Sequence, residues 1–132
     1  MPKAAGYSER SRLDKLGVKP GMRISVLRLD DPGFQRELKS RAAAISYTRA
    51  GRNTDMVFLR ARKKGELRRL GTLQRSIKRN GAIWVLWAKG QSELKAGDVR
   101  KAALDSGLVD IKVAAFSEEL SGLKLVIPVA RR

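Results

Sequence analysis

The residues from Ala82 to Trp87, Ala-Ile-Trp-Val-Leu-Trp, form an almost uninterrupted apolar run. A strand with one face in water alternates apolar and polar side chains, whereas a strand covered on both faces does not. The run therefore predicts a central strand with packed layers on both sides. Trp84 and Trp87 differ in parity along it, so they should face opposite sides of the sheet and pack under different helix layers.

Strands and helices are predicted to alternate around this run. The other strand patterns lie at Met22–Leu29, Ile45–Thr48, Asp55–Arg60, Val109–Phe116 and Leu123–Val129. The helical patterns lie at Arg12–Gly17, Phe34–Ala44 (with Asp at the cap and Pro32 in the first turn), Glu66–Arg79 (ended by Asn80-Gly81) and Asp98–Ser106 (capped by Asp98). Such alternation favours a largely parallel sheet with helices on both faces. We expect a polar N-terminal arm at residues 1–11 and a single α/β domain at 12–132.

Two short connections constrain the topology. The turn at Glu118–Gly122 is too short for a crossover, so the last two strands should be antiparallel. The link from Thr48 to Asp55 is too short for a helix. Either it crosses the sheet in extended form, or the strands that it joins form an antiparallel hairpin.

Several kinds of chemistry are excluded by composition. The chain contains neither cysteine nor histidine, so disulfides, zinc–thiolate sites, cysteine nucleophiles and histidine bases are absent. The first residues show no apolar run of the kind found in a signal peptide, and no segment approaches the roughly 18 apolar residues of a membrane span. We expect a cytoplasmic protein that does not enter a membrane.

Positive charge is concentrated in one part of the chain. The formal net charge is +16, and nine basic residues but one acid lie between Arg60 and Arg79. A helix there would carry its cations opposite a buried face of leucines. The candidate nucleic-acid contacts are Arg62, Lys63, Lys64, Arg68, Arg69, Arg75 and Arg79. Such a basic helix, 60–79, could follow phosphates, with an affinity that falls as salt rises; a merely solvated surface is the alternative.

Several segments resemble known proteins. Asp55-Met56-Val57 and Gly81-Ala82-Ile83-Trp84-Val85 are similar to strand openings in the second half of Rossmann-type methyltransferases. Over nearly its whole length the chain also resembles a family of short bacterial proteins catalogued as a domain of unknown function and grouped with methyltransferase-like folds. The segments that carry this second resemblance are Ala5–Ser8, Lys15–Gly21, Trp84–Lys89, Leu108–Val113 and Ser121–Lys124.

The chain departs from the pattern of that family at two positions. Ala88 stands where the pattern has proline, and Leu120 stands where it has tryptophan. If that tryptophan lines a pocket in the family, the pocket of this chain is altered. The resemblance implies a fold and no activity.

The methyltransferase resemblance implies a site for S-adenosylmethionine, which needs a glycine-rich turn after the first strand and an acid at the end of the second. Here Leu29–Phe34 contains one glycine, and Pro32 removes a backbone donor. The second strand ends in Tyr47-Thr48-Arg49, without an acid. We therefore expect no cofactor and no methyltransferase activity, with a divergent methyltransferase as the enzymatic alternative.

Four residues are candidates for binding a ligand. Asp30 and Asp31 follow the first strand and Lys89 follows the apolar run, where open α/β sheets bind ligands. The carboxylate pair could hold a cation such as magnesium, although we favour a helix cap with a solvated neighbour. Lys89 and Lys124 could form an anion site; we favour the interpretation that they keep strand ends in water.

The sequence thus predicts a reduced Rossmann or methyltransferase-like three-layer sandwich, with a mostly parallel sheet and an antiparallel C-terminal strand. We expect it to act by binding, and we assign no catalytic or metal-binding residue. The candidate partners are nucleic acid or another polyanion, and a second copy of the chain at an exposed sheet edge.

Overall fold

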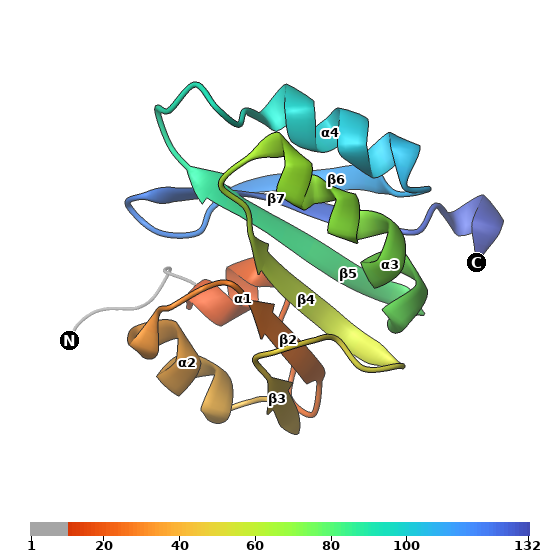
Figure 1. The fold of residues 1–132 in the computed structure, drawn as a ribbon. Helices are drawn as coiled ribbons and strands as arrows, with labels where there is room; N and C mark the ends of the chain where they lie inside the picture. Colours follow the sequence, from red (N-terminus) through yellow and green to blue (C-terminus); the bar gives the residue numbers. More distant parts are fainter. Residues whose placement is uncertain (1–10) are drawn as a thin grey trace.

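The computed structural model describes residues 11–132, so most of the predicted arm lies outside the described residues. Strands in this part form a six-stranded sheet in the order β3-β2-β4-β5-β7-β6 (Figure 1). The strands are β2 (Arg23–Leu27), β3 (Ala44–Ser46), β4 (Thr54–Arg60), β5 (Ile77–Ala88), β6 (Val109–Ala115) and β7 (Leu120–Val126). The helices are α1 (Arg12–Leu16), α2 (Pro32–Lys39), α3 (Arg69–Ser76) and α4 (Ala96–Asp105), with short 3-10 helices η1 (Lys64–Arg68) and η2 (Val129–Arg131).

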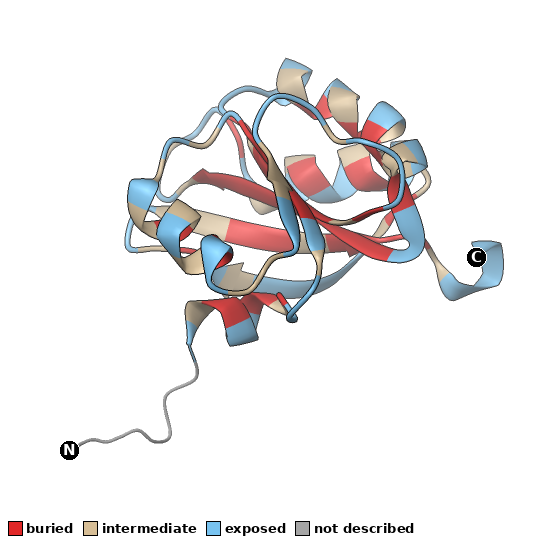
Figure 2. Cartoon of the chain, turned by 90° about the horizontal axis from the view of Figure 1, so that it is seen from below, coloured by how far each residue is buried: buried red, intermediate tan, exposed pale blue. Residues whose placement is uncertain are grey.

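The sheet is mixed, as predicted. The strands β3, β2, β4 and β5 pair in parallel, and β7 is antiparallel to both β5 and β6. Helices α1 and α2 cover one face, whereas α3 and α4 cover the other. Figure 2 shows that the buried residues lie along the strands and on the inward sides of the helices.

The two tryptophans of β5 lie on opposite faces, which confirms the prediction from strand parity. Trp84 belongs to the apolar cluster under α1 and α2, and Trp87 belongs to the cluster under α3 and α4. Trp84 is fully buried, and its indole N–H donates to the carbonyl of Leu16 at 2.9 Å. This bond satisfies the one polar group of the ring and holds the end of α1 on the sheet.

Residues 47–53 join β3 to β4 without a helix. Both strands are parallel neighbours of β2, which lies between them, so the link crosses the sheet in extended form and the hairpin alternative is wrong. The hydroxyl of Ser46 donates to the carbonyl of Arg49 at 2.7 Å, and the hydroxyl of Ser25 on β2 lies 3.5 Å from the same carbonyl. Ala50 packs against the cluster that includes α3, so the link and α3 lie on the same face.

The basic helix is shorter than the sequence predicts. η1 and α3 occupy Lys64–Ser76, and Ile77 is already extended and paired with β4. The predicted continuation to Arg79 is therefore wrong, because strand pairing overrides the local helical pattern. Gly81 does not cap a helix. It permits a close approach of strands, since a Cβ there would lie 2.9 Å from the carbonyl oxygen of Asp55.

Helix α2 begins as predicted and ends early. The carboxylate of Asp31 caps it by accepting from the backbone N–H of Phe34 at 3.0 Å, and Pro32 occupies the first turn. The helix ends at Lys39 rather than Ala44. The chain must turn there to enter β3, and the hydroxyl of Ser40 binds a carbonyl of the last turn at 2.6 Å.

Helix α4 starts two residues before the expected cap. Lys95 is the cap, and Asp98 is the third helical residue, whose carboxylate accepts from the backbone N–H of Lys95 at 2.9 Å. The helix ends before Gly107, whose φ of +80° suits glycine.

The edges of the sheet are the short strand β3 and the longer β6, on which the side chains of Ile111 and Val113 are both 58% exposed. Among residues 11–132, no helix has the length and apolar character needed to cross a bilayer.

Candidate functional site

The strand order reverses between β2 and β4. From β2 the chain continues to β3 on one side, and from β4 it continues to β5 on the other. The loops that follow the two strands, residues 28–31 and 61–63, therefore diverge and leave a crevice between them at the carboxyl edge of the sheet. Ligands of open α/β sheets bind at such a point.

Two adjoining hollows lie at this edge. One, of about 290 Å³, has Asp30, Asp31 and Glu119 in its wall. The other, of about 300 Å³, has Lys63, Gln91 and Glu93 in its wall. They share Arg60, Arg62 and Ala88. Burial and the neighbouring Arg62 lower the pKa of Arg60. Side chains of both signs meet here, so the edge is not uniformly suited to an anion or a cation.

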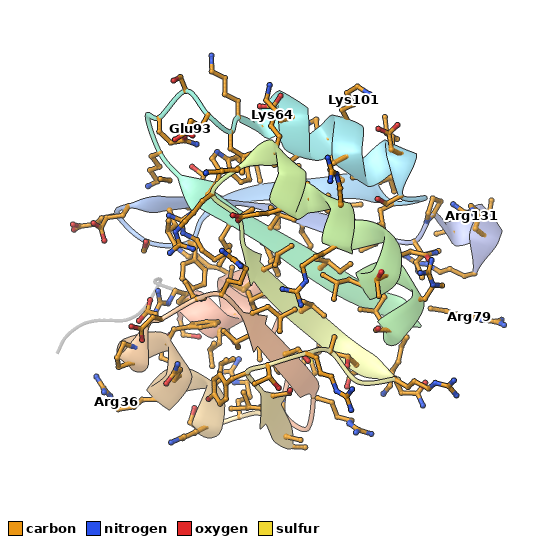
Figure 3. All side chains as sticks on the ribbon, in the orientation of Figure 1. Arg36, Lys64, Arg79, Glu93, Lys101 and Arg131 are labelled. Carbon is orange, nitrogen blue, oxygen red and sulfur yellow. The ribbon has the colours of Figure 1, made fainter. Side chains whose placement is uncertain are left out.

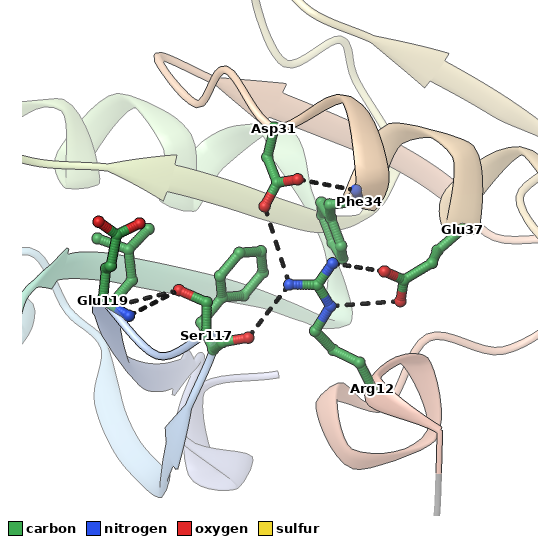
Figure 4. A network of polar contacts seen from close by, with 8 residues as sticks. Arg12, Asp31, Phe34, Glu37, Ser117 and Glu119 are labelled. Carbon is green, nitrogen blue, oxygen red and sulfur yellow. Dashed lines mark hydrogen bonds and ion pairs between the residues drawn. The ribbon is translucent and has the colours of Figure 1, made fainter.

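Asp31 takes part in the packing of the helices. One carboxylate oxygen caps α2, and the other lies 3.8 Å from a guanidinium nitrogen of Arg12 (Figure 4). Arg12 also forms a two-point pair with Glu37, and its guanidinium carbon lies 5.0 Å and 4.8 Å from the ring centres of Phe34 and Phe116. These contacts agree with the interpretation of Asp31 as a cap. In the part of the chain from 11 to 132, no three carboxylates meet as metal ligands.

Lys89 and Lys124 do not lie together. Lys89 is exposed just after β5, where its backbone N–H donates to the carbonyl of Glu119 at 2.9 Å. Lys124 is opposite Trp84 within the β5–β7 ladder and lines a separate hollow at the amino ends of β4 and β5. The prediction of an anion site shared by these two lysines is therefore wrong.

The two departures from the short bacterial pattern prove to be neighbours. Ala88 and Leu120 are direct partners across β5 and β7, and both line the hollow that contains Asp30. The two positions therefore lie at one spot in the wall of the carboxyl-edge hollow.

The predicted nucleic-acid contacts fall into three groups. Arg62 and Lys63 line the carboxyl-edge hollows. Lys64 pairs with Asp98 of α4 at 3.5 Å. The remaining four are Arg68 in η1, Arg69 and Arg75 in α3, and Arg79 in β5. Figure 3 shows Lys64 beside the start of α4 and Arg79 at the far end of the η1–α3 segment.

The fold adds two arginines that sequence reasoning missed. Arg49 and Arg52 belong to the link, residues 47–53, which crosses β2 on the face that α3 also covers (Figure 1). Thr54 pairs with Ile77, so Arg52 and Arg79 lie close to the starts of neighbouring strands. We call the set the basic face: Arg49, Arg52, Arg68, Arg69, Arg75 and Arg79. The sequence did contain a signal for including these two arginines: the segments Leu38–Thr54 and Leu67–Ser92 contain no acidic residue, so their cations have no local carboxylate partner.

The carboxylates that border the basic face already have partners. Glu66 pairs with Arg28 at 3.5 Å, Asp98 with Lys64 at 3.5 Å, and Asp55 with Lys78 at 3.0 Å. The backbone N–H of Arg62, bound to the Glu66 carboxylate, lowers the pKa of Glu66, and the charge of Arg28 lowers it further. Within residues 11–132, no side chain of the basic face forms an ion pair or a side-chain hydrogen bond.

Solved structures establish the fold. A SAM-dependent methyltransferase from Aquifex aeolicus matches with a TM-score of 0.67 and 13% identity, over 88% of this chain and 87% of that one. This chain has a methyltransferase-like Rossmann fold. The magnesium protoporphyrin IX methyltransferase from Synechocystis PCC 6803 with bound SAH matches with a TM-score of 0.67 and 13% identity, over 88% and 78%. A putative methyltransferase from Thermoplasma acidophilum matches with a TM-score of 0.65 and 8% identity, over 93% and 77%. No family model matches the chain, and no curated protein matches its sequence.

The crevice of this chain does not fit S-adenosylmethionine in the way that the fold implies. The left-handed conformation after β2 falls on Arg28, with a φ of +61°, rather than on a glycine. Its guanidinium pairs with Glu66, which also accepts from the backbone N–H of Arg62 at 2.8 Å. These bonds tie the loop after β2 to the loop after β4 across the crevice. The segment that follows β3, Tyr47-Thr48-Arg49, contains no carboxylate of the kind that would hold a ribose.

Proposed function

We propose that this methyltransferase-like domain is a non-catalytic module that binds nucleic acid through the basic face. The observation that carries the proposal is a set of six arginines on η1, α3, the link and the start of β5, none of which has a carboxylate partner within residues 11–132. The neighbouring carboxylates Glu66, Asp98 and Asp55 are paired with other cations. Guanidinium groups bind phosphate oxygens in a two-point geometry, and release of counterions from the nucleic acid drives such binding.

The surface favours contact with the phosphate backbone rather than with bases. Trp84 and Trp87 are both buried, so neither can act as a platform on which bases stack. The arginines come from a helix, a strand start and a link, which suits a broad track of phosphates. We expect little sequence preference and a steep dependence on salt.

The test measures the affinity for a fluorescent 20-base-pair duplex by anisotropy, from about 50 to 200 mM salt. The test variant is Arg68→Gln/Arg75→Gln. The matched control is Arg36→Gln/Lys39→Gln on α2, which removes the same charge from the opposite face. Two lost phosphate contacts should reduce the slope of log K against log salt by about 2, and the control should keep the slope of the unmodified protein. No binding at the lowest salt, or equal loss in both variants, would contradict the proposal.

The divergent methyltransferase is the competing function, and calorimetry distinguishes it. We expect no stoichiometric binding of S-adenosylmethionine or S-adenosylhomocysteine, because Arg28, Glu66 and Arg62 bridge the crevice. Tight binding of either compound would support the enzymatic alternative. A bacterial cytoplasmic location, which the sequence suggested, would bring the basic face into contact with both DNA and RNA.

A further inference from the structure

The hollow that Lys124 lines lies beside α1, on the face of the sheet opposite the basic face. Its volume is about 370 Å³. The lining combines cations with apolar walls; its principal members are Lys19, Lys124, Arg132, Met22, Met56 and Ile111. Volumes of this size are typical of sites for small molecules. We call it the Lys124 pocket.

Lys124 is a half-buried cation in the wall of this pocket. Its ammonium nitrogen lies directly over Gly17, where an added Cβ would be 2.8 Å away. Among residues 11–132 no side chain or carbonyl accepts a hydrogen bond from this nitrogen. Burial lowers the pKa of the Lys124 amine, and the charges of Lys112 and then Lys19 lower it further. Partial removal of the ammonium from water costs free energy, and an anion bound beside it would offset that cost.

A β-bulge in β6 brings the positive charge of Lys112 close to that of Lys124. Asp110 is opposite Leu125, but Lys112 is opposite Lys124, so Ile111 is an extra residue between the two pairs. Without the bulge, Lys112 would lie opposite Leu123 and face the other side of the sheet. Bulges redirect side chains in this way. Here the bulge places two lysines directly opposite each other. Two like charges at opposite positions destabilise a sheet when no anion is bound between them.

The carboxylate in the pocket wall does not relieve this repulsion. Asp55 lines the pocket, yet one of its oxygens lies 3.0 Å from the ammonium of Lys78 and the other accepts from the backbone N–H of Arg23 at 2.8 Å. The ammonium of Lys112 donates to the carbonyl of Lys15 at the end of α1, which leaves its charge uncompensated.

We propose that the Lys124 pocket binds the phosphate group of a small phosphomonoester. Lys19, Lys124 and Arg132 line the pocket, and Lys112 lies opposite Lys124 on β6. Together they supply more positive charge than a ligand with a single carboxylate would balance, which favours a dianion. The pocket is larger than phosphate alone, and Met22, Met56 and Ile111 provide apolar contact for the organic part of the ligand.

The experiment is calorimetry with phenyl phosphate, inorganic phosphate and benzoate at constant ionic strength. We expect phenyl phosphate to bind more tightly than phosphate, and benzoate to bind least. Lys124→Met and Lys112→Met should each weaken phenyl phosphate binding at least about tenfold, by analogy with charge-assisted hydrogen bonds. Lys39→Met, which removes an exposed lysine from α2, should change it less than about twofold.

Tryptophan fluorescence tests whether the ligand binds beside Lys124. In a Trp87→Phe background, Trp84 is the remaining tryptophan, and it is the cross-strand partner of Lys124. Phenyl phosphate should change its emission with the same midpoint as the calorimetric titration. Unchanged affinity in Lys124→Met, or an equal loss in Lys39→Met, would overturn the proposal. Arg68→Gln/Arg75→Gln should leave phenyl phosphate binding intact, which separates this site from the basic face.

Discussion

Arg12 joins three parts of the fold at one point. It projects from α1, pairs with Glu37 on α2, donates to the carbonyl of Phe116 at 3.3 Å, and lies between the rings of Phe34 and Phe116 (Figure 4). The substitution Arg12→Met keeps a long apolar side chain between the rings and removes the charge and the donors. The stability that it loses is therefore that of the polar contacts rather than of packing volume.

The loss can be estimated contact by contact. Two cation–π contacts contribute about 0.5–1 kcal/mol each. The two-point pair with Glu37 contributes about 1 kcal/mol, because the Arg12 and Glu37 side chains are 23% and 37% exposed. The bond to the Phe116 carbonyl contributes about 1 kcal/mol. With the lower value for each cation–π contact, the total is about 3 kcal/mol. An unfolding entropy of about 2.1 cal/mol/K per residue, over 132 residues, converts this to a fall in Tm of about 10 °C.

Urea titration and calorimetry measure both quantities, and Arg36→Met is the matched control. Arg36 is exposed on α2, beside Glu37, and its replacement should change stability by less than about 0.5 kcal/mol. In a double-mutant cycle with Glu37→Gln, the two substitutions should couple by about 1 kcal/mol. If Arg12→Met lowers Tm no more than Arg36→Met does, the assignment of Arg12 as a joint between α1 and α2 is refuted.

Three further substitutions test the packing around β7. Gly122→Ala should reduce stability by about 1–3 kcal/mol in urea titration, because its Cβ would lie 3.0 Å from the Trp84 ring; no loss would mean that the ring has room to move. Gly17→Ala should lose about 1–2 kcal/mol, because Gly17 has a φ of +84°, and the loss should shrink in a Lys124→Met background, where the clash with the ammonium is gone. Because the pKa of Lys124 is below its unfolded value, the unfolded chain binds more protons between the two pKa values, and this lysine contributes a stability that rises with pH across that window. Lys124→Met should therefore be more stable than the unmodified protein at neutral pH, and the difference should narrow as the solution becomes alkaline; a constant difference would show that the charge plays no part.

The succession of strands along the chain was predictable because each strand carries its own pattern, whereas their order in the sheet was not. The apolar run of β5 and the short turn before β7 fix a covered central strand and an antiparallel ending without reference to the rest of the chain. The end of α3 was not predictable in this way. Leucine spacing continues to Ile77, and the pairing of that residue with Thr54 decides its conformation.

The candidate sites also divide into residues that a local sequence pattern reveals and residues that only the fold brings together. The arginines of η1 and α3 were predicted because they are close in sequence. Arg49 and Arg52 join them only because the link crosses the sheet on the same side as α3. The cross-strand pairing of Lys112 with Lys124 depends on a bulge in β6, and no local sequence pattern predicts that bulge.

The link between β3 and β4 has a consequence for motion. β3 is held by a ladder of three residue pairs with β2, and no other strand of residues 11–132 pairs with its outer side. Segments held by so few bonds open at a smaller free energy than the core, so we expect amide hydrogen exchange at Ala44–Ser46 to be faster than in β4 or β5. Arg49 and Arg52 would shift with each opening, while Arg68 and Arg75 stay on a packed helix. If the proposed nucleic-acid binding holds, the basic face would have a fixed half and an adjustable half, and it could follow phosphate tracks of different curvature.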